Sequence, residues 1–354
     1  MKYGFISLSL LSLITVGCGS IPQIVPDTGL ETVLEIDRRP GNVLSMDGTT
    51  LATIHPFAHT HDVRVIEVTD TDSYRPWPNK AIQAGDGTIT DATFDSPFGI
   101  VSDHQGGVWI VDAGFNNGQV RVWHFDLDSG DLIASYNVDP KFATKGSFVQ
   151  DIAVDATHQW VFLADIAPPG IIAMNLQSGE QRRFSSNAMS PERSGSIIIN
   201  GNTVMNGDKP NLVGINPITY HAESDSIFFG AMSGRNWYQI PAEGFREKLS
   251  DAELESSIRR VGPKPISDGA DTALDGTHYI TNLNHNGIDV LSSDGKLLPL
   301  VRDDRLNWPD NIRISDDGYG YIVANQLHLA PALNDGKEEG TRPFYIYRIK
   351  TNND

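Results

Sequence analysis

Three aspartates of this chain are the strongest candidates for proton-transfer chemistry. Asp151, Asp268 and Asp310 each stand where a short apolar segment begins. Carboxyl groups are common acids and bases in enzymes, because burial and neighbouring charges can bring their pKa close to neutrality. Asp151, Asp268 and Asp310 are therefore our candidate catalytic residues, provided that the fold brings them together.

Polar residues stand at the same place in six similar segments. They are Gly41-Asn42, Ser96-Pro97, Gln150-Asp151, Asn216-Pro217, Ser267-Asp268 and Pro309-Asp310-Asn311. This set offers carboxylate and amide oxygens and holds no lysine or arginine. Such a set suits the binding of a small organic ligand. Asn42, Asn216 and Asn311 are the candidates for orienting the ligand, and the neighbouring Trp308 is a candidate for stacking on it.

An oxygen-rich set is also what a hard cation requires, so calcium or another divalent cation is the cofactor that these residues would hold. A cation would relieve the repulsion between carboxylates that lie close together. The alternative is that the same groups hydrogen-bond to loop backbone or to water. The sequence leaves both interpretations open, and no cofactor is certain.

Other chemical motifs are weaker or missing. His55, His59 and His61 lie close together, but their spacing is not that of a tetrahedral zinc site and no cysteine joins them. We expect a solvated loop there. The sequence contains no Gly-x-Ser-x-Gly nucleophile motif and no phosphate-binding loop of the Gly-x4-Gly-Lys type.

The elements that position these residues are repeated hairpins. Six strings each combine a strand, a polar turn and a second, more apolar strand; they begin at Val43, Ile100, Ile152, Ile218, Ala270 and Ile312. This pattern is typical of β-hairpins, and the spacing of the copies is typical of propeller blades. In a propeller the first strand of each blade lines the central channel, so the polar residues named above converge.

A third strand follows each hairpin, and in most copies a weaker fourth strand comes next. The last copy ends after FYIYRIK, at residue 350, without a fourth strand, and ETVLEID from residue 31 is free to supply it. The sequence thus predicts an all-β, six-bladed β-propeller over residues 31–354, closed by pairing of the N-terminal and C-terminal strands. The alternative of two separate β-sandwich domains is disfavoured, because neither half of the chain shows a domain boundary. One helix is predicted around LSDAELESSIRR, with Ser250 or Asp251 as its cap.

The N-terminus has the features of a targeting segment. Lys2 precedes a short apolar stretch, and the only cysteine, Cys18, follows it within ITVGCGS. We interpret residues 1–18 as a signal peptide with a lipobox, Cys18 as the lipidated residue, and residues 19–30 as a tether. The chain is expected to be exported as a lipoprotein of the outer membrane, periplasm or cell surface. The alternative is an ordinary signal peptide and secretion.

The charge balance limits the possible partners. With 27 basic and 45 acidic residues, the formal net charge is −18 at pH 7. Nucleic-acid binding and electrostatic docking on anionic lipid both need a basic face, so neither is expected. A small-molecule ligand is the expected partner, membrane contact is expected only through the N-terminal lipid, and a protein partner is unknown.

Several segments resemble the major royal jelly protein/yellow family. They are GGVWIVDAG with VRVWHFDL, SFVQDIAVD with VFLADIAPPGIIAMNL, GINPITYHAESDSIFFGAMSGRNWYQIP, and NWPDNIRISDDGYGYIVANQLH. They follow in the family's order from about Gly41 to the C-terminus. The resemblance implies a six-bladed propeller with a ligand channel in an extracellular setting. It also implies that Asn325 is a ligand-binding candidate, whereas Gln326 replaces the arginine often found after it.

The family does not fix one activity. Some members are linked to dopachrome conversion, some bind biogenic amines, and others are storage or signalling proteins. The resemblance therefore implies binding of a small catechol-like or indole-like molecule, with isomerisation as the reaction if the chain is an enzyme.

A second resemblance is to gluconolactonase-type propellers, which hold a divalent metal in the channel. Asn216 and Asp268-Gly269 match that pattern in type and blade order, so Asn216 and Asp268 are the candidate metal ligands. Asn42 stands where that family has a glutamate. The resemblance implies a metal-dependent lactonase as an alternative function, and a non-enzymatic binding or scaffold propeller is the third hypothesis.

Overall fold

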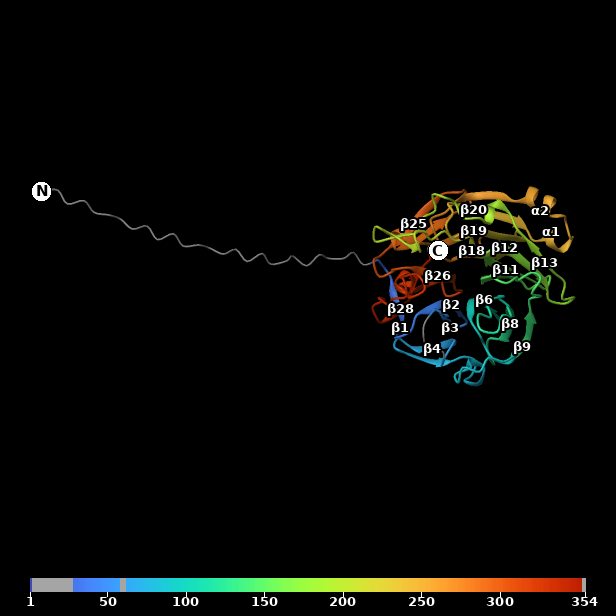
Figure 1. The fold of residues 1–354 in the computed structure, drawn as a ribbon, viewed down its shortest axis with the longest axis horizontal. Coiled ribbons are helices and arrows are strands. Elements are labelled where there is room, and N and C mark those ends of the chain that lie inside the picture. The colour runs from blue at the N-terminus through green and yellow to red at the C-terminus, as the bar shows by residue number, and fades with distance from the viewer. Residues whose placement is uncertain (2–27, 58–61, 352–354) are drawn as a thin grey trace.

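The chain forms a ring of six antiparallel sheets around a central channel (Figure 1). The computed structural model describes residue 1, residues 28–57 and residues 62–351. The predicted all-β, six-bladed propeller is confirmed. The predicted signal peptide, the lipidation site Cys18 and most of the predicted tether lie outside the described residues.

Five blades are each built from four consecutive strands, ordered from the channel outward. They are blade 1 with β2 (Pro40–Met46), β3 (Thr49–Ile54), β4 (Val65–Asp70) and β5 (Ser73–Pro76); blade 2 with β6 (Pro97–Ser102), β7 (Gly107–Asp112), β8 (Arg121–Asp126) and β9 (Leu132–Asn137); blade 3 with β10 (Val149–Asp155), β11 (Trp160–Ile166), β12 (Pro169–Asn175) and β13 (Gln181–Phe184); blade 4 with β18 (Ile215–His221), β19 (Ser226–Ala231), β20 (Asn236–Pro241) and β21 (Arg259–Pro263); and blade 5 with β22 (Ala270–Thr272), β23 (His278–Asn282), β24 (Gly287–Leu291) and β25 (Leu297–Arg302).

Blade 6 is closed by the two ends of the chain. Its strands from the channel outward are β26 (Pro309–Ile314), β27 (Tyr319–Ala324), β28 (Phe344–Lys350) and β1 (Glu31–Ile36). Leu34 of β1 is fully buried and pairs with Ile346 of β28. The predicted closure is therefore confirmed, and it removes the open edges that unpaired strands would leave.

Local sequence explains the hairpins and the core between blades. In blade 1 the turn residues Asp47 and Gly48 both have positive φ, 49° and 78°, which Asp-Gly turns tolerate. The core consists of apolar layers between neighbouring blades, such as Phe162 of blade 3 against Ile227 and Phe229 of blade 4. Neighbouring blades are thus held together by apolar side chains on the sheet faces that they turn towards each other.

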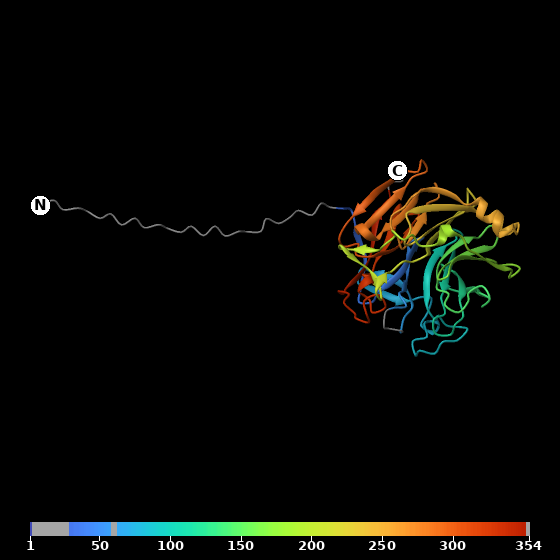
Figure 2. The same ribbon diagram turned by 45° about the horizontal axis from the view of Figure 1, so that its top comes forward.

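Two short helices lie at the rim between β20 and β21 (Figures 1 and 2). The helix α2 (Asp251–Ser257) matches the predicted helix, and Ser250 caps it reciprocally with Glu253. The preceding α1 (Glu243–Arg246) was not predicted. No helix among the described residues is both long and apolar enough to cross a bilayer.

A long connection between blades 3 and 4 crosses the propeller. It contains the 3-10 helix η2 (Asn187–Met189) and the small strands β14 (Ile198–Ile199), β15 (Asn202–Thr203), β16 (Met205–Asn206) and β17 (Lys209–Pro210). The other 3-10 helices of the described residues lie in different loops: η1 (Ala81–Gln83), η3 (Leu283–His285) and η4 (Leu327–Leu329). Ile197, Ile199 and Val204 of this connection pack in one cluster with Trp308 and Leu327. We call residues 196–204 the covering segment, because it buries the region around Trp308.

Candidate functional site

The six innermost strands bring the predicted polar residues to one end of the channel. We call the face where β2, β6, β10, β18, β22 and β26 begin the top face, and the opposite face the bottom face. Asn42, Asp151, Asn216, Asp268, Trp308, Asp310, Asn311 and Asn325 are all buried there, each with at most 5 % of its surface exposed. The convergence expected from the sequence is therefore present, whereas the functional role of each residue stays a prediction.

Asp268 accepts hydrogen bonds from two neighbours. Trp308 donates through Nε1 at 2.7 Å, and Asn216 donates through Nδ2 to the other carboxylate oxygen. Burial raises the pKa of Asp268 to about 7; the bond from Trp308 opposes this rise and the charge of Asp151 adds to it. Asp268 can therefore exchange a proton near neutral pH.

Asp310 is a second buried acid, held by a different amide. Asn325 donates through Nδ2 to Asp310 at 2.7 Å and to the carbonyl of Pro40 at 3.0 Å. Burial raises the pKa of Asp310 well above its usual range, and the charges of Asp268 and Asp151 act in the same direction. Asp310 is thus a weaker acid than an ordinary aspartate.

Two amide oxygens at this end of the channel lack hydrogen-bond donors. Asn42 Oδ1 and Asn325 Oδ1 are buried, and no partner for either lies among the described residues. A buried acceptor without a donor costs about 1–3 kcal/mol. Both oxygens are therefore ready to accept a hydrogen bond from a ligand or water.

Asp151 is the acid that has a cationic partner. Arg313 of blade 6 reaches across the channel to Asp151 of blade 3, with Nη2 at 2.9 Å from Oδ1. The same guanidinium donates to the carbonyls of Ala270 at 2.7 Å and Ile100 at 3.2 Å. Burial raises the pKa of Asp151, and the charge of Arg313 opposes this rise. Arg313 thus ties four blades together across the channel.

The sequence analysis missed Arg313, because it considered only the first residues of each inner strand. A signal was available: alternate residues of a strand face the same side, so Arg313 must point the same way as Asn311. Asn311 itself accepts the backbone N–H of Val43 at 3.2 Å, which joins blade 6 to blade 1. This contact gives Asn311 a structural partner in addition to its predicted ligand role.

Five aromatic rings gather beside the acids, and the sequence analysis did not predict them as a group. Phe57 stacks with Phe115, and Phe148 packs against Phe98 at 5.1 Å and Phe115 at 5.0 Å between ring centroids; His55 contacts Phe57 and Phe98. Burial lowers the pKa of His55 to about 3, so this ring is neutral. We call these five residues the aromatic cluster.

The aromatic cluster and the acids are direct neighbours. Gly99, the residue after Phe98, lies directly against Asp151, because a Cβ atom placed on Gly99 would be only 2.8 Å from Asp151 Oδ1. Thr53 links the two groups again, since its hydroxyl donates to the carbonyl of Phe98 and accepts the N–H of Asn42. A pocket of about 100 Å³ lies beside the cluster, lined in part by His55 and Phe115. His59 and His61 lie outside the described residues.

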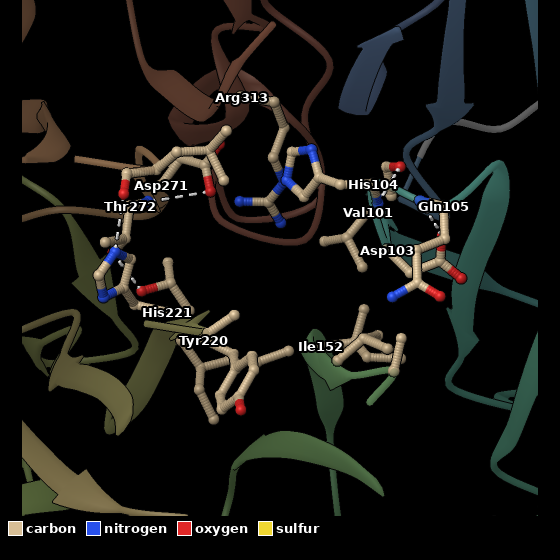
Figure 3. Close-up of a pocket in the computed structure, with 18 of the residues that line it drawn as sticks. Val101, Asp103, His104, Gln105, Ile152, Tyr220, His221, Asp271, Thr272 and Arg313 are labelled. Carbon is tan, nitrogen blue, oxygen red and sulfur yellow. Dashed lines mark hydrogen bonds between the residues drawn. The ribbon is translucent and has the colours of Figure 1, made fainter. Parts of the chain in front are cut away.

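The bottom face has a separate pocket of about 110 Å³ (Figure 3). Arg313, His104, Tyr220 and Ile152 surround it, and Arg313 stands between this pocket and Asp151. The volume is below the usual 300–1,000 Å³ of sites for organic ligands. This pocket therefore suits water better than an organic ligand.

The two residues predicted to hold a cation are hydrogen-bonded to each other, and Asp268 is also bonded to Trp308. Asn216 turns its amide nitrogen, not its oxygen, towards Asp268, and Trp308 takes the second oxygen of this carboxylate. The two predicted metal ligands therefore do not present oxygens to a common point. This arrangement does not fit a cation held by Asn216 and Asp268 together.

Among the described residues, one group of three possible metal ligands lies within 4.8 Å: Asp155, His158 and Asp225. Arg246 donates to Asp155 at 2.9 Å and to Asp225 at 3.0 Å. Since Arg246 already compensates both carboxylates, this group is better explained as an ion-pair network.

Solved structures share the fold at low sequence identity. Virginiamycin B lyase from Staphylococcus aureus, solved as a catalytically inactive H270A form with quinupristin, aligns with a TM-score of 0.54 and 15% identity over 91% of this chain and 99% of that chain. The gluconolactonase XC5397 from Xanthomonas campestris aligns with a TM-score of 0.53 and 11% identity, over 91% of this chain and 88% of that chain. A luciferin-regenerating enzyme aligns with a TM-score of 0.53 and 11% identity, over 92% of this chain and 95% of that chain.

No curated protein matches the chain significantly in sequence. The family model described as "Major royal jelly protein" matches residues 95–351, which is more than half of the chain and covers blades 2 to 6. The resemblance inferred from the strand motifs is thereby confirmed over this range, and the chain belongs to the major royal jelly protein family.

Proposed function

We propose that this propeller binds a small aromatic molecule at the top end of its channel and moves protons within it. The observation that supports this most strongly is the pair of buried acids: the pKa of Asp268 is raised to about 7, and that of Asp310 is raised well above its usual range. Groups with such values are suited to acid–base catalysis at neutral pH. The expected reaction is isomerisation of a catechol-like or indole-like compound.

The two acids would have different roles. Asp268, which is partly ionised near pH 7, would remove a proton from the ligand, and Asp310 in its protonated form would supply one at another position. This leaves the total number of protons on the ligand unchanged, as a tautomerisation requires. The unpartnered oxygens of Asn42 and Asn325 would accept N–H or O–H groups of the ligand, and Asn216 would keep Asp268 oriented.

The aromatic cluster supports an aromatic ligand, because rings favour offset or edge-to-face contact with other rings. The site is closed in this structure, since the acids are buried and the adjacent pocket is only about 100 Å³. Binding therefore requires displacement of covering residues. Ile197 and Ile199 of the covering segment and Trp308 are the side chains that would have to separate.

The test is turnover and binding of dopachrome, related catechols and aromatic amines by the purified soluble domain. Asp310→Asn and Asp268→Asn are expected to lower turnover by about 10²–10⁴-fold, the usual contribution of general acid–base catalysis. Asp294→Asn, in an exposed turn, is the control and should retain turnover. Binding without turnover would support a non-enzymatic binding propeller, and neither binding nor turnover would contradict the proposal.

A metal-dependent lactonase is the second candidate, favoured by the unpartnered oxygens of Asn42 and Asn325 beside Asp310. Elemental analysis after dialysis, with and without added calcium, tests it. A stoichiometric divalent ion that is lost in Asp310→Asn would favour this candidate, and lactones would then be the substrates to assay.

We further propose that the chain is exported and anchored through lipidated Cys18, with residues 19–30 as tether. The support is the sequence pattern around ITVGCGS and the absence of a second cysteine. Metabolic labelling with a fatty acid tests this, with Cys18→Ala as the comparison. Equal labelling of both forms would contradict the lipid anchor.

A further inference from the structure

Lys264 is a buried amine that the proposed function does not use. It follows β21 on the connection to blade 5, and only 2 % of its surface is exposed. Its Nζ donates to the carbonyl of Pro265 at 2.8 Å and to the hydroxyl of Ser267 at 2.9 Å. Among the described residues, no carboxylate forms an ion pair with it, which is unusual for a buried lysine.

These contacts suit a neutral amine better than an ammonium ion. A neutral amine has two N–H hydrogens, and Pro265 and Ser267 are two acceptors. The nitrogen lone pair then remains unbonded. Burial lowers the pKa of Lys264 to about 7, and the more distant charge of Glu192 offsets only part of this effect. A substantial share of Lys264 is therefore nucleophilic at neutral pH.

Lys264 also lines a pocket large enough for an organic molecule. Its volume is about 470 Å³, and its lining includes Arg235, Arg302 and His285. Asp289 is the one carboxylate of this lining, and Arg302 pairs with it. The lining thus carries more positive than negative charge, although the chain as a whole is acidic.

The stem of Lys264 occupies space that only a glycine leaves open. A Cβ atom at Gly230 would lie 2.6 Å from Lys264 Cε and 2.9 Å from Cδ. Real Cβ contacts are essentially never this short. A glycine at position 230 of β19 is therefore required for the amine to lie where it does beside the pocket.

We propose that Lys264 forms an imine with an aldehyde or ketone that carries a carboxylate or phosphate group. The amine lone pair adds to the carbonyl carbon, a C–N bond forms, and the amine proton moves to the carbonyl oxygen. Loss of this hydroxyl together with the second amine hydrogen, as water, then gives the C=N bond. Arg235 would attract the anionic group. Imine formation at Lys264 would not require proton transfer by Asp268 or Asp310.

The test uses pyridoxal 5′-phosphate as the anionic aldehyde and pyridoxal as its counterpart without phosphate. Each is incubated with the folded protein at pH 7.5, the imine is reduced with borohydride, and the adduct is located by peptide mapping. Lys264 is expected to carry most of the adduct at low reagent concentration. Pyridoxal 5′-phosphate should label it several-fold more than pyridoxal at equal concentration.

Two variants complete the test. Lys264→Arg keeps a positive charge and is expected to abolish the preferred adduct, whereas Lys296→Arg, at an exposed turn, should leave it unchanged. Labelling spread over exposed lysines without preference for Lys264 would overturn the proposal, and so would equal labelling by both aldehydes. If Lys264→Arg does not fold, peptide mapping of the unaltered protein still decides the question.

Discussion

Replacing Asp268 with asparagine is expected to stabilise the protein at alkaline pH. Asparagine has nearly the same shape, and it can retain both hydrogen bonds: its oxygen accepts from Trp308, and its nitrogen donates to the oxygen of Asn216 once that amide turns over. The variant therefore removes a buried ionisable group with little loss of packing.

The size of the effect follows from the pKa of Asp268. In the folded state it is raised from 3.8 to about 7, and such a difference corresponds to about 4 kcal/mol between the two protonation states. With ~2.1 cal/mol/K per residue for the entropy of unfolding and ~320 folded residues, this is a shift in Tm of about 6 °C. Both values are upper limits, because the variant loses some hydrogen-bond strength.

The sign depends on which state holds the proton. Below pH 4 Asp268 is protonated in both the folded and the unfolded state, so its ionisation does not change the free energy of unfolding. Between pH 4 and 7 the unfolded state loses the proton while the folded state keeps it, so the stability of the unaltered protein falls as pH rises. Above pH 7 the loss is complete and constant.

The assay is thermal unfolding of both proteins from pH 4 to pH 9. Other buried acids, among them Asp310 and Asp151, contribute to the pH dependence of both proteins, so the difference between the two curves reports Asp268 together with its charge effect on these neighbours. This difference should grow between pH 4 and 7 and then level off. Parallel curves over this range would refute the assignment of a raised pKa to Asp268.

Two further substitutions test the structure away from the acid pair. Arg313→Met should lower the free energy of unfolding by about 3–5 kcal/mol, because it leaves Asp151 buried without its partner, and adding Asp151→Asn should restore part of this loss in denaturant unfolding. A double variant no more stable than the single one would argue against this ion pair. Leu34→Ala should cost about 2–5 kcal/mol by opening a cavity in the apolar layer between blades 6 and 1, whereas the exposed Glu35→Gln should change stability by less than ~0.5 kcal/mol; equal effects of both would contradict closure by β1.

The fold could be predicted from the sequence because its information is local and repeated. Each blade carries its own turn residues and apolar strands, and the missing fourth strand of the last copy directly indicated the use of residues 31–36. The convergence of Asp151, Asp268 and Asp310 followed from their equivalent positions in the repeat.

The contacts within the site could not be predicted in the same way. Arg313 and Asp151 belong to blades on opposite sides of the ring, and the aromatic cluster combines Phe98 of β6 with side chains from separate loops. Such contacts depend on ring diameter and on side-chain reach, which a repeat pattern does not contain. The choice of Trp308 as a partner of Asp268 likewise depends on where the chain enters blade 6.

Closure of blade 6 also has a consequence for the order of folding. Glu31 and Arg348 are bonded across 317 positions of the chain, so β1 cannot complete its pairing until synthesis has passed β28. Contacts of such long sequence separation form slowly, because the entropy of closing the loop must be overcome first. Until then β1 and β27 each keep an unpaired edge, and an incomplete chain is the form most exposed to aggregation.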